Sequence, residues 1–586
     1  VPTQSFSFRL LVCLTKDGHW LQFSQTSPHL FREFMEVLGL SWMFDDPEWS
    51  TAPEFDTEEK RERFWEKLLE AARRKTLAEW QAIFAERTNV WAEPFRTTRE
   101  VLHHPQLRHN RQVLEVPDPR AGRVRMLAPM VRMDETPGAV RWLAPELGEH
   151  TAEVLSRISE SEPARRTARV AVPRQPLEGV TILDLGVFYA APYGPAILAD
   201  YGARVIKVEP LSGEPMRRML PFPDAGAVKS LQGKESVAVD IARPEGREIL
   251  HRLVREVDLV MVSYRAGVAR KHGLDYDTLR AINPRLVYLN APGYGIDGPC
   301  GRKPAYAPTI GAAVGAARLQ AGPSVQARAD LSLEEIKSAS IRLGHAASAP
   351  GQADGCGALG VATALLLGLV ARERTGLGQE MLTSMLATAA FCVSEDAIEY
   401  DTRAERRQPD ALLLGLSALY RLYEASEGWI FLAAPKPREW GALCAALSPH
   451  ASLASDSRFA TLDARKGHDA ELAATLAAVF RRRPAAEWER DLTDVDVGCV
   501  EVAPGPVARA VMDDPIGREA GFLCEVEHPS FGRHRRLAPL AELSLTPGEG
   551  KPACLFGQQT EAVLRELGYG AAEIERLEAG GVIARS

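Results

Sequence analysis

The stretch LEGVTILDLGVFYAAPYGPAILADYGARVIKVEPLSG, residues 177–213, decides the fold of this chain. Its first apolar run, Val180–Leu185, leads into a turn rich in small residues, and a second apolar run, Ala203–Glu209, contains β-branched residues. Between them, Ala196–Tyr201 has the spacing of a helix that stops at Gly202. This alternation predicts a strand–helix–strand unit at the start of a doubly wound parallel sheet, and therefore an α/β fold.

The strand ends of this unit indicate where a ligand binds. In doubly wound sheets, ligands lie beyond the carboxyl ends of the strands, here near Gly186–Pro195 and Glu209–Gly213. No G-x-G-x-x-G motif follows the first strand, so the sequence does not favour a dinucleotide site. Two further apolar runs, Asp258–Ser263 and Leu286–Ala291, continue the alternation and predict more strands of the same sheet.

Length and composition exclude several classes of protein. The chain has 586 residues, 45% hydrophobic and 25% charged, which is typical of a globular protein with two or more cores. Its net charge is −8, without a basic stripe, which argues against nucleic-acid binding. The most apolar helix, around Val361–Val370, is expected to be too short to cross a membrane. The eight cysteines form no C-x-x-C pair, so we expect thiols in a reducing cytoplasm and no metal site.

Three ordered motifs resemble those of the family III CoA transferases, also called the CaiB/BaiF family. They start at LDLGVFYAAPYGP (183–195), at GKESVAVDIARPEG (233–246) and at ARERTGLGQ (371–379), and the resemblance runs from about Leu177 to the C-terminus. It implies a Rossmann-like large domain and a smaller α+β domain. It also implies interlinked dimers, in which the active site lies between the large domain of one chain and the small domain of another.

A second copy of part of this pattern precedes it. RLLVCLTKDGHWLQFSQTSPHLFREFMEVLGL, residues 9–40, resembles YRLYEASEGWIFLAAPKPREWGALCAAL, residues 420–447, and later pairs keep the same order. This repeat predicts a tandem duplication and a pseudo-dimer or homodimer. The predicted parts are an incomplete first unit (1–155), a linker (156–176), a large domain (177–400), a small domain (411–548) and a segment returning to the large domain (549–586).

A CoA site needs cations for the phosphates and an apolar groove for the rest of the ligand. By resemblance, the residues that bind coenzyme A or acyl-CoA are Tyr189, Ala190, Leu231, Lys234, Ser263, Tyr264, Arg265 and Lys271. Lys271 stands where the family usually has Arg, so the charge is kept but the two-pronged guanidinium is lost. The alternative is that these cations belong to solvated surface loops.

The catalytic position departs from the family pattern. The family transfers CoA through an anhydride and a thioester on an Asp, but the matching residue here is Ala307, and the His of the racemase branch is replaced by Tyr306. A later family Asp is matched by Asp354, which is also a plausible helix N-cap. Other candidates for a substitute nucleophile are Asp297, Cys356, and Asp330, Glu334, Glu335 and His345 in a segment, 316–353, that we expect to be a mobile or inserted loop.

The resemblance therefore implies an acyl-CoA transferase that moves CoA between a thioester donor and a carboxylic acid acceptor. Two alternatives stay open. Ala307 is compatible with a non-catalytic acyl-CoA-binding pseudoenzyme or subunit, and Asp354 with a 2-methylacyl-CoA racemase or isomerase.

Overall fold

The computed structural model describes residues 7–141, 144–160, 173–219, 222, 224–348, 353–505 and 507–586. The chain forms two compact units: Val1–Arg318 with Ala327–Arg403 and Cys524–Ser586, and Leu319–Gln326 with Ala404–Leu523. The predicted small domain, 411–548, overlaps the second unit only up to residue 523. Of the predicted linker, residues 161–172 lie outside the described residues.

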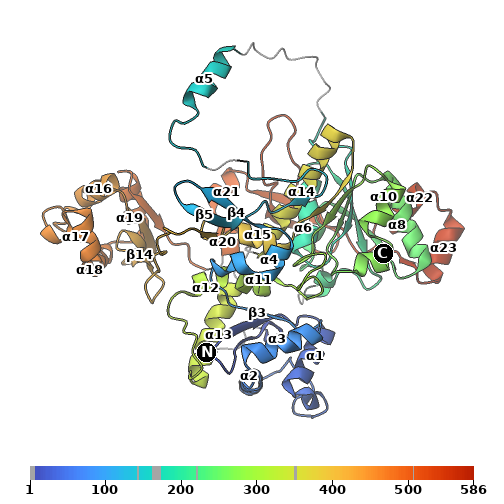
Figure 1. Ribbon diagram of the computed structural model, residues 1–586, viewed down its shortest axis with the longest axis horizontal. Helices are drawn as coiled ribbons and strands as arrows, with labels where there is room; N and C mark the ends of the chain where they lie inside the picture. Colours follow the sequence, from blue (N-terminus) through green and yellow to red (C-terminus); the bar gives the residue numbers. More distant parts are fainter. Residues whose placement is uncertain are drawn as a thin grey trace. The chain divides into compact units, whose positions relative to one another are not determined.

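An eight-stranded sheet forms the centre of the first unit (Figure 1). Its spatial order is β20 (Ile583–Ala584), β9 (Lys234–Val239), β8 (Arg204–Glu209), β7 (Thr181–Leu185), β10 (Leu259–Val262), β11 (Val287–Asn290), β12 (Gln379–Leu382) and β6 (Arg132–Met133). The six strands from β9 to β12 are parallel, and the two short edge strands are antiparallel. The predicted doubly wound parallel sheet is confirmed.

The chain changes direction across the sheet at β7. From β7 it runs outward to β8 and β9, and it then returns to the other side of β7 to form β10, β11 and β12. The carboxyl ends of β7 and β10 therefore flank the point where the strand order reverses, which is where open α/β sheets bind ligands.

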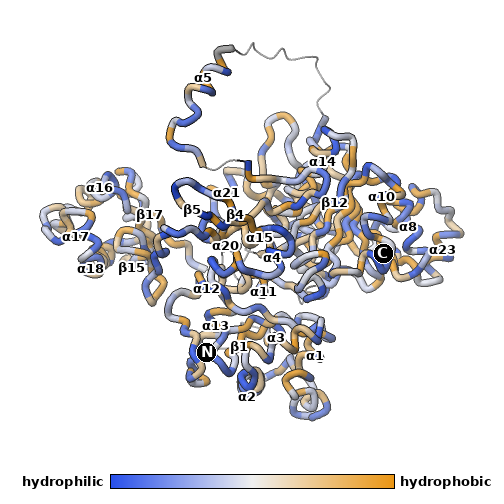
Figure 2. Tube along the Cα trace, in the orientation of Figure 1, coloured by the Kyte–Doolittle hydropathy of each residue, from blue (hydrophilic) through white to orange (hydrophobic). Residues whose placement is uncertain are grey.

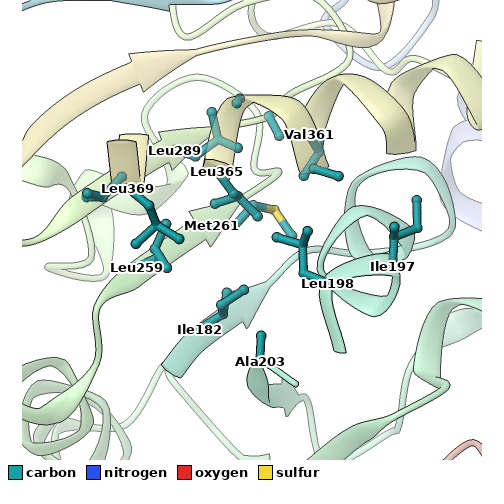
Figure 3. Packing of buried hydrophobic residues seen from close by; sticks show 14 of the residues in the cluster. Ile182, Ile197, Leu198, Ala203, Leu259, Met261, Leu289, Val361, Leu365 and Leu369 are labelled. Carbon is teal, nitrogen blue, oxygen red and sulfur yellow. The ribbon is translucent and has the colours of Figure 1, made fainter. Parts of the chain in front are cut away.

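Helices cover both faces of the sheet, so its strands are apolar on both faces, and Figure 2 shows hydrophobic residues gathered around β12. One face packs against α6 (Ala190–Ala199) and α14 (Ala353–Thr375). In Figure 3, Leu365 of α14 lies beside Met261 of β10 and Leu198 of α6. The other face packs against α8 (Pro244–Glu256), α10 (Tyr276–Ile282), α22 (Thr560–Glu566) and α23 (Ala571–Ala579).

Helix α6 begins at Ala190, six residues before the predicted start at Ala196. Pro192 lies in the first turn, where a missing N–H costs no helical hydrogen bond, and Pro195 removes only one bond further along. A Cβ atom at Gly194 would lie 2.5 Å from Val361, so this glycine allows α6 to pack closely on α14.

Helix α14 corrects the expected length of the most apolar segment. It has 23 residues and is long and apolar enough to cross a membrane by length and composition alone. However, 56% of its most apolar stretch is buried inside the protein, as in the core helix of a globular domain. The contacts of Val361, Leu365 and Leu369 with the sheet show that α14 serves here as a core helix.

The predicted loop at 316–353 is wrong over most of its described length. Residues there form α12 (Ala316–Ala321) and α13 (Leu333–Ala347). Ser332 and Glu335 cap the start of α13, and the helix buries Ile336 and Leu343. The many Ala and Ser residues weaken the sequence periodicity, so the helix becomes evident only from what it packs against.

The N-terminal part of the first unit is a small α+β layer. A three-stranded antiparallel sheet, β1 (Val12–Leu14), β2 (Trp20–Phe23) and β3 (Ala92–Pro94), packs with α1 (Pro28–Leu38), α2 (Glu58–Ala72) and α3 (Leu77–Glu86). It leads into α4 (Pro105–His109), a hairpin of β4 (Val113–Asp118) and β5 (Gly122–Leu127), and, after β6, α5 (Thr151–Glu160). Helices α11 (Ala307–Ala313) and α13 of the large domain pack against the three-stranded sheet.

The second unit contains a four-stranded antiparallel sheet, ordered β14 (Gly415–Ser417), β15 (Tyr420–Glu424), β16 (Trp429–Ala433) and β17 (Gly498–Glu501). Its helices are α16 (Pro437–Leu447), α17 (Leu462–Gly467), α18 (Asp469–Phe480), α19 (Ala485–Thr493), α20 (Val507–Asp513) and α21 (Pro515–Glu519). The hairpin β18 (Leu523–His528) and β19 (Gly532–Leu537) follows. A hairpin, a set of helices and a third strand thus occur in the same order as in residues 12–94, with four helices here and three there.

Candidate active site

A cavity of about 890 Å³ opens at the carboxyl ends of β7 and β10, where the strand order reverses. The loop after β7, the loop after β10 and the starts of α11 and α14 line it. His29 of α1 lines it as well, so the N-terminal layer contributes to the same cavity as the large domain. Its position agrees with the expected ligand site near Gly186–Pro195.

The loop after β7 is held in an unusual conformation. Phe188 has a φ of +68°, a left-handed conformation that costs free energy for a residue with a side chain. Its N–H donates to Glu214 Oε1 at 2.8 Å, and the N–H of Val187 donates to Ser263 Oγ at 2.9 Å. Buried Lys207 pairs with Glu214 at 3.3 Å, which anchors the acceptor of the first bond. The cavity wall is therefore built before any ligand arrives.

Five of the eight residues expected to bind CoA line this cavity: Tyr189, Ala190, Ser263, Tyr264 and Arg265. The other three do not line it. Leu231 is fully buried against Ala553 and Cys554, and Lys271 is an exposed residue at the end of α9 (Val268–Lys271).

Lys234 is buried inside the protein and does not line the cavity. Its Nζ donates to Asp184 Oδ2 at 2.5 Å and to the carbonyl of Pro192, and the side chain is fully buried. Burial lowers the pKa of Lys234, and the charge of Asp184 opposes that shift. Because the lysine begins a central strand, its side chain points into the sheet packing, which the sequence motif alone does not reveal.

Lys229, five residues before Lys234, does line the cavity, as does Lys303. Burial lowers the pKa of Lys229 and that of Arg265, which indicates two partly desolvated cations facing the same space. A bound phosphate or carboxylate would restore favourable contacts to both. Lys229 lies just before the motif that contains Lys234, and burial distinguishes the two lysines.

The N-terminal layer is fastened to the cavity by polar contacts. Lys303 Nζ donates to the backbone carbonyls of Phe84 and Arg87, and Arg265 Nη1 donates to Asn89 Oδ1 at 3.1 Å. Trp91 Nε1 donates to the hydroxyl of Tyr294 at 2.8 Å. Sequence reasoning missed these contacts and His29, because no local pattern links residues more than 170 positions apart.

Asp354, in the first turn of α14, is the only acidic residue that lines this cavity within the part of the chain that the structure describes. Burial raises its pKa to about 6. Ala307 and Tyr306 line the cavity at the start of α11. The cavity thus holds a single carboxylate with a shifted pKa, as expected for a reactive acid.

The other candidate nucleophiles lie elsewhere. Asp297 is exposed, and its Oδ1 accepts a hydrogen bond from His109 Nε2 at 2.8 Å outside the cavity lining. The carboxylates that we expected to fold over the site lie before α13 or in its exposed first turn: they are Asp330, Glu334 and Glu335. His345, from the same segment, lines a different cavity. Cys356 does not line the cavity and contacts Cys392 instead.

Comparisons with known proteins show the family to which the chain belongs. The family model described as CoA-transferase family III matches residues 6–151 and 177–560. A succinyl-CoA–D-citramalate CoA-transferase of Chloroflexus aurantiacus is 29% identical over 391 residues, covering 64% of this chain and 90% of that protein. A succinyl-CoA:glutarate CoA-transferase of Mus musculus is 28% identical over 418 residues, covering 70% and 90%. The crystal structure of a CAIB/BAIF family protein from Brucella suis superposes with a TM-score of 0.55 at 25% identity, covering 67% of this chain and all of that one.

Proposed function

Because the chain belongs to CoA-transferase family III and is a CoA transferase, we propose that the cavity between β7 and β10 is its active site and that Asp354 is its nucleophile. In this proposal CoA moves from an acyl-CoA donor to a carboxylic acid acceptor. The observation that carries the proposal is that Asp354 is the lone carboxylate among the described residues that line the cavity, which also presents Lys229 and Arg265.

The lining of the cavity supports an acyl-CoA ligand. Lys229 and Arg265 are suited to anionic groups, and the aromatic rings of Phe188 and Tyr306, 5.4 Å apart, offer an apolar surface for the acyl chain or the pantetheine arm. The activities of the two relatives above make succinyl-CoA the first donor to test, with a short dicarboxylic acid as acceptor.

The chemistry follows from the state of Asp354. The ionised carboxylate attacks the thioester carbonyl, and the CoA thiolate leaves, which forms a mixed anhydride. The thiolate then attacks the aspartyl carbonyl and releases the first acid, so that CoA is held as an aspartyl thioester. The acceptor carboxylate and the returning thiolate repeat these two steps in reverse and regenerate Asp354.

This assignment predicts a defined pH dependence. Attack requires the ionised form of Asp354, whose pKa burial raises to about 6. Activity should therefore rise as the pH increases through about 6 and should fall tenfold for each unit below it.

Trapping tests the assignment directly. The chain is incubated with succinyl-CoA, treated with borohydride or hydroxylamine, and digested for mass spectrometry. We expect modification of Asp354 in the wild type and in the control Asp297→Asn, and none in Asp354→Asn. An equal label in Asp354→Asn, or label on another carboxylate, would overturn the assignment.

Ala307 favours a second candidate, a cavity that binds acyl-CoA without transferring it. Ala307 lines the wall where the family has its nucleophile. In that case calorimetry would show acyl-CoA binding, wild-type protein would not be labelled, and Ala307→Asp would gain both label and activity.

The two similar parts of the chain carry a further proposal, that residues 1–155 and residues 411–586 arose by duplication. The shared order of strands and helices supports it, as do two matching tryptophan contacts. Trp80 Nε1 donates to the carbonyl of Ala72, the last residue of α2, and Trp488 Nε1 donates to the carbonyl of Phe480, the last residue of α18.

A further inference from the structure

Two cysteine side chains meet at the contact between α14 and α15 (Met385–Phe391), beside the proposed active site. The sulfur atoms of Cys356 and Cys392 lie 2.8 Å apart. Cys356 is the fourth residue of α14, and Cys392 caps the end of α15. The proposed nucleophile, Asp354, precedes Cys356 by two residues on the same helical turn.

We propose that Cys356 and Cys392 form an oxidative modification site: a peroxide converts them to an intramolecular disulfide, which changes the position of Asp354. The disulfide itself rests on the geometry of the two thiols, whereas its effect on turnover rests on the proposed function of Asp354.

The geometry requires little movement. A disulfide joins its sulfurs at about 2.05 Å, so the two atoms have to approach by less than about 1 Å. The helices are already in close contact, because a Cβ atom at Gly360 of α14 would lie 2.2 Å from Thr388 of α15. The first turn of α14 can therefore be drawn toward α15 without displacing an intervening side chain.

The exposure of the two thiols sets the order of the reaction. Cys392 is exposed and Cys356 is half-buried, and burial is the main cause that raises the pKa of Cys356 to about 12. Cys392 therefore meets the oxidant first. Its thiolate attacks hydrogen peroxide, which forms a sulfenic acid and releases one water.

Cys356 then resolves the sulfenic acid. Its sulfur attacks the sulfur of Cys392, the S–S bond forms, and the hydroxyl leaves with the proton of Cys356 as a second water. Overall, two thiols and one hydrogen peroxide give one disulfide and two waters. Five of the other six cysteines are buried, so they are protected from the same oxidant.

The disulfide acts on the cavity through α14. Asp354 and Gly355 line the cavity from the first turn of this helix, and Met385 lines it from the start of α15. A shift of the order of 1 Å in a reacting group costs up to about a hundredfold in rate. We therefore expect the oxidised protein to transfer CoA at least about tenfold more slowly, and dithiothreitol to restore the rate.

The experiment treats the full chain with hydrogen peroxide, blocks the remaining thiols with N-ethylmaleimide, and maps disulfides by mass spectrometry without reduction. Activity with succinyl-CoA and a dicarboxylic acid is measured on the same samples. The variants Cys356→Ser and Cys392→Ser remove either thiol, and Cys524→Ser, a half-exposed cysteine on β18, is the matched control. Thermal unfolding of each variant identifies any that fails to fold.

We expect a Cys356–Cys392 peptide in the wild type and in Cys524→Ser, with a reversible loss of activity in both. Both other variants should stay active in peroxide. If Cys392 is oxidised but no Cys356–Cys392 peptide appears, the modification site is refuted. A disulfide that leaves activity unchanged refutes the coupling to Asp354. If the reduced protein is inactive, the proposed function fails, and the peptide map still decides the disulfide.

Discussion

The sheet β1–β2–β3 near the N-terminus and the sheet β15–β16–β17 in the second unit have the same pairing but different surroundings. In the first, Val12 pairs with Gln22 and Leu14 with Trp20, which places these side chains on one face. In the second, Leu422 pairs with Phe431 and Glu424 with Trp429, so the corresponding face carries these residues. In both sheets the third strand adds antiparallel to the second.

The two faces differ in burial. Trp20 is 2% exposed, whereas Trp429 is 41% exposed. Glu93 of β3 is fully buried, whereas Val500, which has the corresponding pairing on β17, is 50% exposed. Helices α11 and α13 of the large domain pack against the first sheet. Similar sequences therefore form the same three-stranded arrangement twice. The compared face of the first sheet is part of a core because helices of the large domain pack against that sheet.

The largest expected difference in stability concerns Trp20 and Trp429, which occupy corresponding positions in the two sheets. Trp20→Ala should lower the free energy of unfolding of the first unit by about 3–5 kcal/mol, because it empties a fully packed site. Trp429→Ala should cost less than about 1 kcal/mol in the second unit, because the side chain is partly in water already. Denaturant unfolding, followed by hydrogen exchange in each unit, measures both changes. Equal losses would show that the second face is also covered.

The buried Glu93 should make the first sheet sensitive to acid. Burial raises the pKa of Glu93, but Arg96 at its side and His104 outweigh burial and lower the pKa to about 2. Since the pKa is lower in the folded state than the usual 4.5, the ionised carboxylate stabilises the fold above about pH 4.5. This contribution, about 3 kcal/mol, is lost as the pH falls from 4.5 to 2.

Glu93→Gln separates this effect from that of other carboxylates. The unfolding free energy of the variant should change less between pH 5 and pH 2 than that of the wild type. Val500→Ala, at the matching position of the second unit, should leave the pH dependence as it is. Parallel curves for the wild type and Glu93→Gln would contradict the assignment.

Two buried tryptophans, one in each unit, should cause similar losses of stability when they are replaced. Trp80 and Trp488 are both buried, and each indole donates to a helix-terminal carbonyl, at 3.2 and 2.8 Å. Replacement of either by Phe leaves that carbonyl without its donor and should cost about 1–3 kcal/mol in its own unit. Thermal unfolding of the two variants measures the effect. A loss in one unit only would argue against equivalent cores.

The smallest expected effect concerns ligand binding. His29 is the second residue of α1 and lines the cavity, and Arg438 is the second residue of α16. His29→Ala should weaken CoA binding less than about tenfold, because it removes one polar contact at the cavity wall. Arg438→Ala should leave the affinity unchanged. Isothermal calorimetry with CoA compares them, and an equal loss in both variants would exclude a specific contribution from His29.

Much of the fold was predictable because its signals are local. Strands such as Thr181–Leu185 and Arg204–Glu209 stand out as short apolar runs bounded by turns, and their alternation with helices indicates a parallel sheet. Helix α13 was missed because its apolar residues are separated by Ala and Ser. Its stability depends on contacts with β1 and α11, which are distant in sequence.

The site was predictable in its place but only partly in its residues. The loops after β7 and β10 follow from the strand order, and Tyr189 and Arg265, assigned by resemblance, do line the cavity there. Lys234 and Leu231 were assigned to the cavity although they are buried elsewhere, and Lys229 and His29 were missed. Membership of a motif does not tell which of two nearby lysines points into the protein.

By itself, the sequence determined the α/β class, the strand ends at which a cavity opens and the resemblance to a CoA-transferase family, because hydrophobic period and turn residues act over a few neighbours. Only the tertiary structure decided that Asp354, Lys229 and Arg265 line one cavity, that Lys234 is paired with Asp184, and that Trp20 is buried while Trp429 is not. The physical reason is that burial and charge pairing depend on which distant segments come together, and no local pattern records that choice.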